Sequence, residues 1–404
     1  MPAKKHVLVL GAGAAGSSAA QVLAQHEDIA TTAIAATETA PYNRTLVNKA
    51  VATGLIDAKQ AHLPLLPTTT IRDSAEVIFP KHQHVELRSG TQLDYDAVIV
   101  ATGSTPRPLP AGIAGPGTLE SGLLTHLHSL DDALRVRAVI EQTPAARVLI
   151  YGAGFIGAET AGILNHAGCE VTLAAASKLP GVTVFGSQIA EQLARAHHDA
   201  VDTHFGHALT ALERTDRGLY AVFDDGRDLT ADLVITALGT LPLSPAPWSG
   251  PIHVDSRLRS REHAKSYAAG GVAVHEHAGA AWRIDHWDDA LAQGAHAARS
   301  VLFDLGLKED PGPYRPRALY SAQIHDHLYF VAGHTSPLGT PRTLTTSPLV
   351  LAHEDAGRLL AVAGLDAAAE VMDLVPQLHA PTVDVAHSRN SPSTDTPWGY
   401  TVRA

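Results

Sequence analysis

Two glycine-rich segments have the residue spacing that binds the pyrophosphate of a dinucleotide. Both read Gly-x-Gly-x-x-Gly, follow an apolar run typical of a buried strand, and open a helical pattern. In such a loop the first glycine permits a tight turn, the second lets the backbone approach the phosphates, and the third packs the helix against the strand. The helix N-terminus also directs free N–H groups at the anion. One such pattern is weak evidence, but two in the same context predict two dinucleotide sites. The expected residues are Gly11, Gly13, Ala14, Ala15 and Gly16 in the first loop and Gly152, Gly154, Phe155, Ile156 and Gly157 in the second.

The elements that must position these loops form two strand–helix–strand units about 140 residues apart. The first unit has strands over 6–10 and 30–36 around a helix over 14–25, and the second has strands over 147–151 and 169–174 with helices over 157–167 and 187–197. Short strands are expected within 76–100 and 218–235, and a long helix over 287–305. The segments 318–332, 342–351 and 359–363 alternate like an antiparallel sheet, with a helix near 366–376. This order predicts an α/β fold with two Rossmann-like dinucleotide-binding domains and a C-terminal α+β domain.

Composition narrows the class of protein. The 404 residues include 41 acidic and 30 basic side chains, so the net charge of -11 argues against nucleic acid and against an anionic membrane surface as partners. No apolar stretch approaches the roughly 18 residues that a membrane helix needs. Cys169 is the only cysteine, which excludes an intrachain disulfide and fits a cytoplasmic protein. We expect Cys169 to be a small buried apolar residue.

Five further motifs follow one another in a fixed order. They are PYNRTLVNK at 41–49, AVIVATG at 97–103, VITALGTLP at 234–242, YAAGGVAV at 267–274 and RIDHWDDALAQG at 283–294. Together with the two glycine loops they resemble the FAD/NAD(P)-dependent pyridine nucleotide oxidoreductases of glutathione reductase-like fold. The most similar branch is the putidaredoxin, rubredoxin and ferredoxin reductases. The resemblance implies FAD on the first loop and NADH or NADPH on the second.

The resemblance also implies a domain layout. An FAD-binding domain would comprise 1–110 and 240–310, and an NAD(P)-binding domain would comprise 111–239. A C-terminal interface domain would span 311–385, where such proteins often form homodimers. The Ser-, Thr- and Pro-rich segment 386–404 is expected to be a flexible tail.

Particular residues take roles by this resemblance. Arg44 would contact the FAD diphosphate and Lys49 would lie near flavin N5, with Glu159 as its carboxylate partner. A fixed cation there stabilises reduced flavin, and the carboxylate favours the charged lysine. Tyr320, Gln323 and His325 would line the pocket for the electron acceptor. The other FAD contacts expected are Glu38, Ala101, Thr102, Gly103, Gly239, Gly271, Val272 and Trp287.

Three positions depart from the family pattern. Gly271 stands where the family has an aspartate that holds the ribityl chain of the flavin. The glutamate that binds the FAD ribose falls at Thr37, one residue before Glu38. In the second unit Ala175 replaces the acidic residue that binds the ribose 2′-hydroxyl of NADH, and Lys178 follows nearby. That change favours NADPH only weakly, because Lys178 could bind its 2′-phosphate but is equally consistent with a solvated loop lysine.

Two histidine pairs raise the question of a metal. Residues 275 and 277, and residues 325 and 327, each place two imidazoles on one face of an expected strand. A third ligand at suitable spacing is missing from both pairs, so no metal site is predicted.

Three functions remain open. The first is an oxidoreductase that takes hydride from NAD(P)H and passes electrons from flavin to a ferredoxin- or rubredoxin-like protein. The second is a flavoenzyme that acts on a small organic metabolite. The third is a flavin-poor enzyme or binding protein without redox turnover. Related disulfide reductases carry a cysteine pair in the segment that corresponds to 45–49, which here reads TLVNK, so a thiol mechanism is excluded.

Overall fold

The first parallel sheet carries the first glycine loop. A computed structural model describes residues 3–37, 39–277, 280–316, 318–334, 340–355 and 357–379. Its first sheet has the order β19-β7-β1-β2-β3, and all neighbouring strands are parallel. The strands are β1 (Lys5–Leu10), β2 (Ile29–Ala35), β3 (Thr69–Arg72), β7 (Ala97–Val100) and β19 (Ser266–Ala268). The strand from residue 266 therefore belongs to the same sheet as the N-terminal strands.

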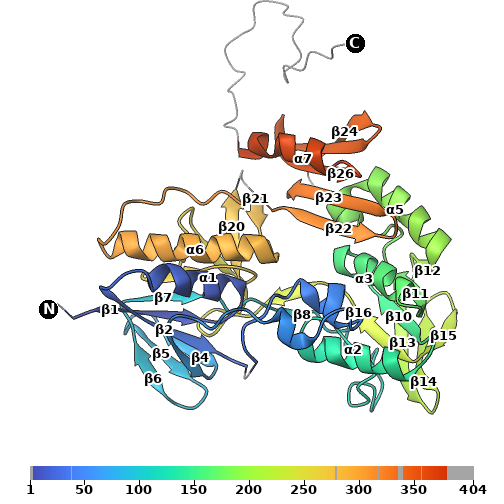
Figure 1. Cartoon of the computed structure of the whole chain (residues 1–404), viewed down its shortest axis with the longest axis horizontal. Helices are drawn as coiled ribbons and strands as arrows, with labels where there is room; N and C mark the ends of the chain where they lie inside the picture. Colours follow the sequence, from blue (N-terminus) through green and yellow to red (C-terminus); the bar gives the residue numbers. More distant parts are fainter. Residues whose placement is uncertain are drawn as a thin grey trace, which may run out of the picture.

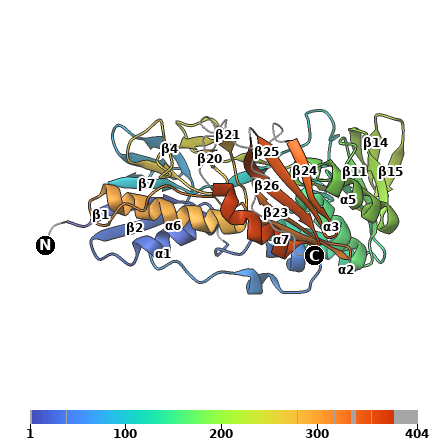
Figure 2. The same ribbon diagram turned by 90° about the horizontal axis from the view of Figure 1, so that it is seen from above.

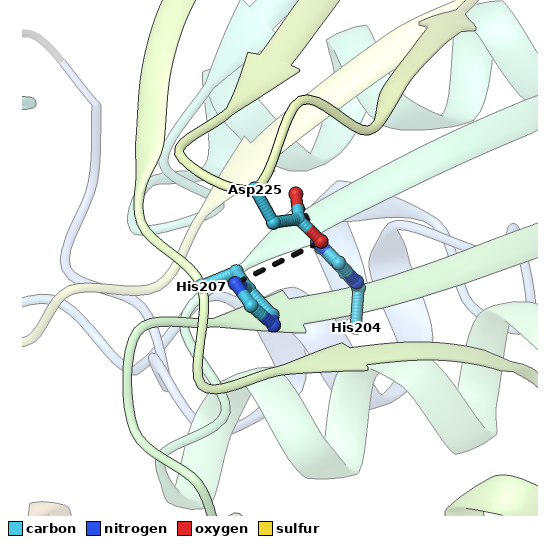
Figure 3. Close-up of side chains that lie close together, drawn as sticks. All are labelled: His204, His207 and Asp225. Atoms are coloured by element: carbon cyan, nitrogen blue, oxygen red, sulfur yellow. Dashed lines mark ion pairs between the residues drawn. The ribbon is translucent and has the colours of Figure 1, made fainter.

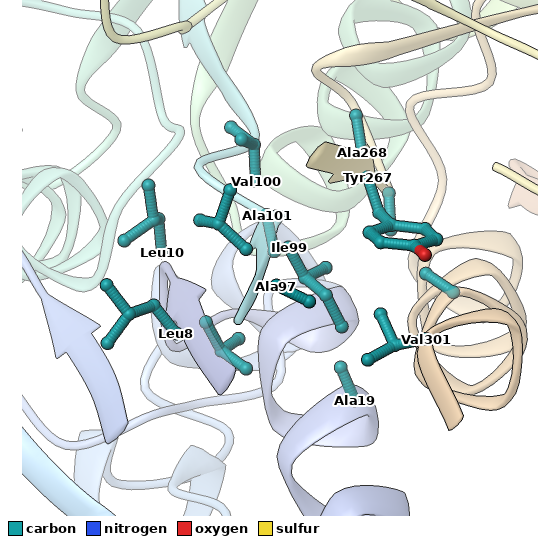
Figure 4. Close-up of a cluster of buried hydrophobic side chains, with 14 of the residues drawn as sticks. Leu8, Leu10, Ala19, Ala97, Ile99, Val100, Ala101, Tyr267, Ala268 and Val301 are labelled. Atoms are coloured by element: carbon teal, nitrogen blue, oxygen red, sulfur yellow. The ribbon is translucent and has the colours of Figure 1, made fainter. Parts of the chain in front are cut away.

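Two helices cover one face of this sheet, α1 (Ala14–Leu23) and α6 (Trp287–Asp304) (Figure 1). They lie side by side because Gly294 lacks a side chain: a Cβ there would lie 2.0 Å from the backbone oxygen of Ala15. Figure 4 shows part of this apolar core, in which Ile99 of β7 lies near Ala19 of α1 and Val301 of α6. A small antiparallel sheet of β4 (Ala75–Phe79), β5 (His84–Leu87) and β6 (Gln92–Asp94) completes this part of the molecule.

The second parallel sheet repeats the arrangement with the order β12-β11-β10-β16-β9. Its strands are β9 (Leu124–Thr125), β10 (Arg147–Tyr151), β11 (Glu170–Ala175), β12 (Asp202–Phe205) and β16 (Leu233–Thr236). The helices around it are α3 (Phe155–His166), the short α4 (Val182–Phe185), α5 (Ser187–Ala200) and α2 (Leu130–Gln142). An antiparallel sheet of β13 (Leu209–Thr215), β14 (Gly218–Phe223) and β15 (Asp228–Ala231) packs beside them.

The sequence analysis did not predict α2. Its N-terminus has a capping box in which the Ser129 hydroxyl accepts from the backbone N–H of Asp132 and the Asp132 carboxylate accepts in return from the Ser129 backbone N–H. Only Leu130, Ala133 and Val136 of this helix are buried, so its apolar stripe is narrow and easily overlooked.

The C-terminal sheet is wholly antiparallel, with the order β22-β23-β26-β25-β24. Its strands are β22 (Tyr320–Ile324), β23 (His327–Gly333), β24 (Thr340–Thr346), β25 (Leu349–Asp355) and β26 (Arg358–Leu365), followed by α7 (Ala368–Leu374) and a 3-10 turn (Val375–His379). One face packs against α3, α4 and α5, with Phe185 of α4, Ile189 of α5 and Tyr329 of β23 in the shared core. Figure 2 shows this layer lying across the junction of the two halves. The expected tail, 386–404, lies outside the described residues.

The chain passes between the two parallel-sheet units on two short strands, β8 (Ser104–Pro106) and β17 (Thr240–Pro242), which pair with each other antiparallel. A third small sheet contains β18 (Ile252–Val254), β20 (Ala273–His277) and β21 (Ala280–Trp282). Between β2 and β3 the chain forms a π-helical turn (Val47–Val51) and a 3-10 turn (Ala58–Ala61). Among the residues described, no helix is both long and apolar enough to cross a membrane.

Candidate active site

The first glycine loop has the shape that a pyrophosphate requires. Gly11 has φ +110°, and a Cβ on it would lie 2.3 Å from the backbone oxygen of Ala101. A Cβ on Gly16 would lie 1.9 Å from the backbone oxygen of Gly11, so helix and strand approach as closely as backbones can. A Cβ on Gly13 would meet no atom within 4 Å. The middle glycine therefore faces open space, which is where the phosphates of a dinucleotide belong.

The second glycine loop reproduces this geometry almost atom for atom. Gly152 has φ +115°, and its Cβ would lie 2.4 Å from the backbone oxygen of Ala237. A Cβ on Gly157 would lie 1.9 Å from the backbone oxygen of Gly152, and one on Gly154 would meet nothing within 4 Å. The loop residues Phe155 and Ile156 begin α3, as Ala14 and Ala15 begin α1. Both loops thus fit a dinucleotide at the carboxyl edge of their sheets.

A lysine from the segment between β2 and β3 meets a glutamate of α3. Lys49 Nζ lies 3.2 Å from Glu159 Oε1, and Asn48 Nδ2 donates to Glu159 Oε2 at 2.8 Å. Glu159 is on the first turns of α3 and its side chain is 2% exposed, whereas the Lys49 side chain is 42% exposed. The expected pair is therefore present, with a buried carboxylate and an exposed lysine. Lys49 and Asn48 sit on the π-helical turn, a rare conformation often found at functional sites.

Arg44 precedes this turn and contacts a histidine. Its Nη1 lies 3.0 Å from His128 Nε2. Burial, together with the charge of Arg44, lowers the pKa of His128 to about 4, so this imidazole is neutral at pH 7. A neutral ring can accept a hydrogen bond from the guanidinium without neutralising it, so the positive charge of Arg44 can attract an anion such as a diphosphate.

The remaining motif residues lie in the segments that follow β7, β16 and β19 and at the start of α6. Ala101 contacts Gly11, the Thr102 hydroxyl donates to the backbone of Leu243, and Gly103 accepts from the Leu243 backbone N–H at 3.0 Å. The Gly239 backbone oxygen accepts from the Arg107 backbone N–H at 2.9 Å, while Gly271 and Val272 follow β19 and Trp287 opens α6. The bonds of Thr102 and Gly103 to Leu243 fix the segment that follows β7 beside the first loop.

A polar cluster of Arg283, Thr240 and Asp285, which the sequence did not reveal, lies beside Gly271. Arg283 Nη2 donates to the Thr240 hydroxyl at 2.7 Å, Thr240 donates to the Asp285 carboxylate, and Arg283 Nη1 donates to the backbone oxygen of Gly271 at 2.8 Å. The only signal in the sequence was the presence of both Arg283 and Asp285 in the motif RIDHWDDALAQG.

The outer end of the first loop opens into a cavity of about 240 Å³ lined by Ala12, Pro41, Leu65, Leu66, Thr68, Thr70 and Arg72. Arg72 Nη1 donates to the backbone oxygen of Thr37 at 2.8 Å and so closes the end of β2. Glu38, expected to contact the cofactor, lies outside the described residues. Arg72 is a cation beside this cavity that the sequence reasoning did not identify.

At the second loop the strand end lacks a carboxylate. Ala175 ends β11, and Ser177 and Lys178 after it are exposed. The next strand brings His204 and His207 beside this end, where the His207 backbone N–H donates to the Ala175 oxygen at 3.3 Å.

His204, His207 and Asp225 lie within 4.8 Å of one another (Figure 3), the one group of three possible metal ligands among the described residues. The two rings stack with planes only 12° apart. Their in-plane lone pairs therefore do not converge on one point, and this arrangement gives no support for a metal. The histidines at 325 and 327 do not converge either, because His325 contacts His197 and His327 contacts Asp366. The side chain of residue 277 lies outside the described residues, so the pair at 275 and 277 stays untested.

The three residues expected at the acceptor pocket separate. The Tyr320 ring lies 4.9 Å from the His286 ring and 6.1 Å from the Phe155 ring, so it bridges the starts of α6 and α3. Burial raises the pKa of Tyr320, which stays protonated. Gln323 is exposed and lies three residues along β22, on the opposite face. His325 lies in the turn beyond the far end of the strand, 3.0 Å from His197 Nδ1. Strand alternation and strand length therefore carry Gln323 and His325 away from Tyr320, and the acceptor pocket stays a prediction.

Comparison with known proteins places the chain. The profile of the family described as pyridine nucleotide-disulphide oxidoreductase matches residues 5–294. The chain belongs to this family. It is an oxidoreductase that uses FAD and NAD(P)H.

Similar relatives of this pyridine nucleotide-disulphide oxidoreductase include the ferredoxin reductase component of a chlorobenzene dioxygenase from a Cupriavidus species, 27% identical over 90% of this chain and 89% of that protein. Putidaredoxin reductase from Pseudomonas putida is 30% identical over 57% of this chain and 56% of the relative. Among solved structures, the covalent putidaredoxin reductase–putidaredoxin complex has a TM-score of 0.81 at 21% identity, covering 92% of this chain and 93% of that one. Fdr9 has a TM-score of 0.80 at 25% identity, covering 93% and 94%.

The single cysteine of this oxidoreductase lies at the amino edge of the second sheet, opposite to the edge that carries the glycine loop. Cys169 directly precedes β11 and is 6% exposed, whereas the loops lie at the carboxyl ends of the strands. It lines a cavity of about 480 Å³ with Arg147, Glu170 and Asp202, which are the first residues of β10, β11 and β12. Burial raises the pKa of the Cys169 thiol, which keeps it protonated and weakly reactive.

Proposed function

We propose that this chain is an electron-transfer reductase: it takes hydride from NAD(P)H onto FAD and delivers electrons directly to a small iron–sulfur protein of ferredoxin type. The observation that carries the proposal is the Lys49–Glu159 ion pair at 3.2 Å, which joins the π-helical turn between β2 and β3 to the helix that the second glycine loop opens. We propose that this cation lies within reach of both cofactors.

The glycine loops support the placement of each cofactor. FAD would take the first loop, with its diphosphate at Gly13 and Arg44 and its adenosine in the cavity beside Arg72. NAD(P)H would take the second loop at Gly154. Bound FAD supplies the two-electron acceptor that can release electrons singly. Lys49 stabilises negative charge that develops there, and Glu159 holds the Lys49 side chain in place.

The aromatic ring of Tyr320 supports a closed contact between the two cofactors. It packs on His286 at the start of α6 and on Phe155 at the start of α3, one helix from each half. We propose that this ring excludes water from the site of hydride transfer. We also propose the domain layout that the resemblance implies. In that layout, residues 1–110 with 240–310 form the FAD domain, 111–239 the NAD(P) domain and 311–385 the interface domain.

The cysteine content supports direct transfer from flavin. Cys169 is the only cysteine, it is buried, and it lies at the amino edge of the second sheet. A dithiol relay within the chain is therefore impossible, and no thiol lies at the carboxyl edge where the cofactors would meet.

The choice of acceptor rests on the relatives, whose names describe ferredoxin and putidaredoxin reductases. Arginines in the C-terminal part of the chain give little support for docking an acidic partner. Arg315 is exposed, but Arg342 Nη2 already bonds Glu354 at 2.6 Å, and residue 317 lies outside the described set.

The test is steady-state reduction of cytochrome c by the flavin-loaded protein and NAD(P)H, with and without a small ferredoxin. We expect a rate that depends on the ferredoxin concentration and saturates with it. Cys169→Ala is the matched control and should behave like the parent protein. A rate that ignores ferredoxin but responds to small organic acceptors would replace this proposal with the metabolite flavoenzyme.

A further inference from the structure

Gly271 is a glycine for reasons of space. Its neighbour Gly270 has φ +79° and needs to be glycine for its backbone conformation, but Gly271 has no positive φ. A Cβ built on Gly271 would lie 2.3 Å from Oδ1 of Asp285 and 2.9 Å from its Cγ. The carboxylate of Asp285 therefore fills the space into which a side chain at position 271 would grow.

Both residues are fixed to the same helix. The Gly270 backbone N–H donates to Gln293 Oε1 at 2.7 Å, and Gln293 Nε2 donates to Asp289 Oδ2 at 2.6 Å. Gln293 and Asp289 are buried in α6. Asp285 stands two residues before the first residue of that helix. The turn at 270–271 and the carboxylate thus keep one relative position.

The Asp285 carboxylate is held and charged. Thr240 donates to it, and Arg283 Nη1 lies 3.3 Å from Oδ2. Burial alone would raise the pKa of Asp285, but hydrogen bonds from Ser104 and Thr240 and the charge of Arg283 lower it below its ordinary value. The side chain is still 32% exposed, so the carboxylate is accessible from solvent.

The location identifies the part of the ligand. A Cβ on Gly270 would lie 3.2 Å from the Ala15 side chain, so this turn lies beside the first turn of α1, next to the pyrophosphate loop. A carboxylate repels phosphate, and it accepts hydrogen bonds from hydroxyl groups. The hydroxyl-bearing chain between the diphosphate and the ring of FAD is the part that offers such donors.

We infer that Asp285 replaces the aspartate missing at position 271 and anchors the ribityl hydroxyls of FAD from the segment before α6. The inference rests on the proposed placement of FAD at the first glycine loop. It also explains why position 271 can be glycine. The carboxylate now comes from position 285 of the chain but occupies the space that a side chain at position 271 would take.

The experiment measures the dissociation constant of FAD by fluorescence quenching on flavin-stripped protein. A hydrogen bond to a charged group contributes about 1.5–3 kcal/mol, so Asp285→Asn and Asp285→Ala should raise the Kd about 10- to 100-fold. Asp216→Asn is the control, since Asp216 is an exposed carboxylate in the β13–β14 turn and should leave the Kd unchanged. Kd values within twofold of the parent for both Asp285 variants would overturn the inference.

The reciprocal change sharpens the test. Gly271→Asp alone should weaken FAD binding and lower the melting temperature, because its side chain overlaps the Asp285 carboxylate. Gly271→Asp combined with Asp285→Ala should recover FAD binding to within about fivefold of the parent, since the charge returns to the same space. A single Gly271→Asp variant that binds FAD like the parent would contradict the inference.

Gly13→Asp separates this inference from the placement on which it rests. Loss of FAD binding in Gly13→Asp with intact binding in the Asp285 variants would leave FAD at the first loop and refute only the role of Asp285. Intact FAD binding in Gly13→Asp would refute the placement itself.

Discussion

The ion pair between Lys49 and Glu159 makes a quantitative prediction. Two unit charges 3.2 Å apart attract by about 1 kcal/mol in water and about 5 kcal/mol at an effective dielectric constant of about 20. The Glu159 carboxylate is buried, but Lys49 is 42% exposed, so solvent screens the pair from one side. We therefore expect a coupling energy of about 1–3 kcal/mol, between those of exposed and fully buried pairs.

A double-mutant cycle measures this coupling. Lys49→Met and Glu159→Gln, singly and together, are compared by urea unfolding of the flavin-free protein. Lys49→Met leaves the buried carboxylate with only Asn48 Nδ2 at 2.8 Å as partner, so it should destabilise more than the double variant. The exposed pair Arg88–Glu76, with N···O 3.1 Å, is the control and should show a coupling below about 1 kcal/mol.

The same variants test the role of the cation in catalysis. Removing Lys49 should lower the two-electron potential of the bound flavin by roughly 20–60 mV, since about 30 mV corresponds to 1.4 kcal/mol. Lys49→Arg, which keeps the charge, should preserve most of the potential. The reasoning fails if Lys49→Met leaves both potential and hydride-transfer rate unchanged, or if the cycle couples no more strongly than the exposed control.

Four further outcomes follow from the geometry. Gly13→Asp should abolish retention of FAD, whereas Gly154→Asp should keep FAD and lose reduction by NAD(P)H, as absorbance spectra and anaerobic titration will show. Lys178→Ala should raise the KM for NADPH about tenfold and leave that for NADH unchanged; equal effects on both would make Lys178 a solvated lysine. Tyr320→Ala should slow hydride transfer about tenfold in stopped flow while Tyr320→Phe should not, because the ring makes the contacts. Burial and the charge of His325 lower the pKa of His197 to about 3, below its ordinary 6.5. Between these two pH values only the unfolded chain takes up the proton, so the free energy of unfolding falls as pH drops from about 6.5 towards 3. His197→Gln should flatten urea-unfolding stability against pH by up to about 1.4 kcal/mol per pH unit; an unchanged slope would refute the assignment.

The sequence predicted the elements whose signal is local. Apolar runs before Gly11 and Gly152 predicted β1 and β10, and the family resemblance implied the pairing of Lys49 with Glu159. It also predicted the antiparallel C-terminal sheet from the alternating pattern. Glycine spacing carries this information because each glycine is required by a backbone contact close by, such as the one between Gly16 and Gly11.

The sequence could not predict features that depend on packing between distant segments. Gly271 looked like a lost cofactor contact, because only the folded chain shows Asp285 in its place. Gln323 and His325 looked like pocket residues until the direction of β22 separated them from Tyr320. The exposure of Lys49 depends on how the π-helical turn meets α3, which no local pattern encodes.

The most direct test of the central claim is anaerobic double-mixing stopped flow. NAD(P)H should bleach the visible flavin absorbance, and a second mixing with oxidised ferredoxin should restore it, at rates that Cys169→Ala leaves unchanged. Failure of NAD(P)H to bleach the flavin, or of ferredoxin to restore its absorbance, would contradict the account.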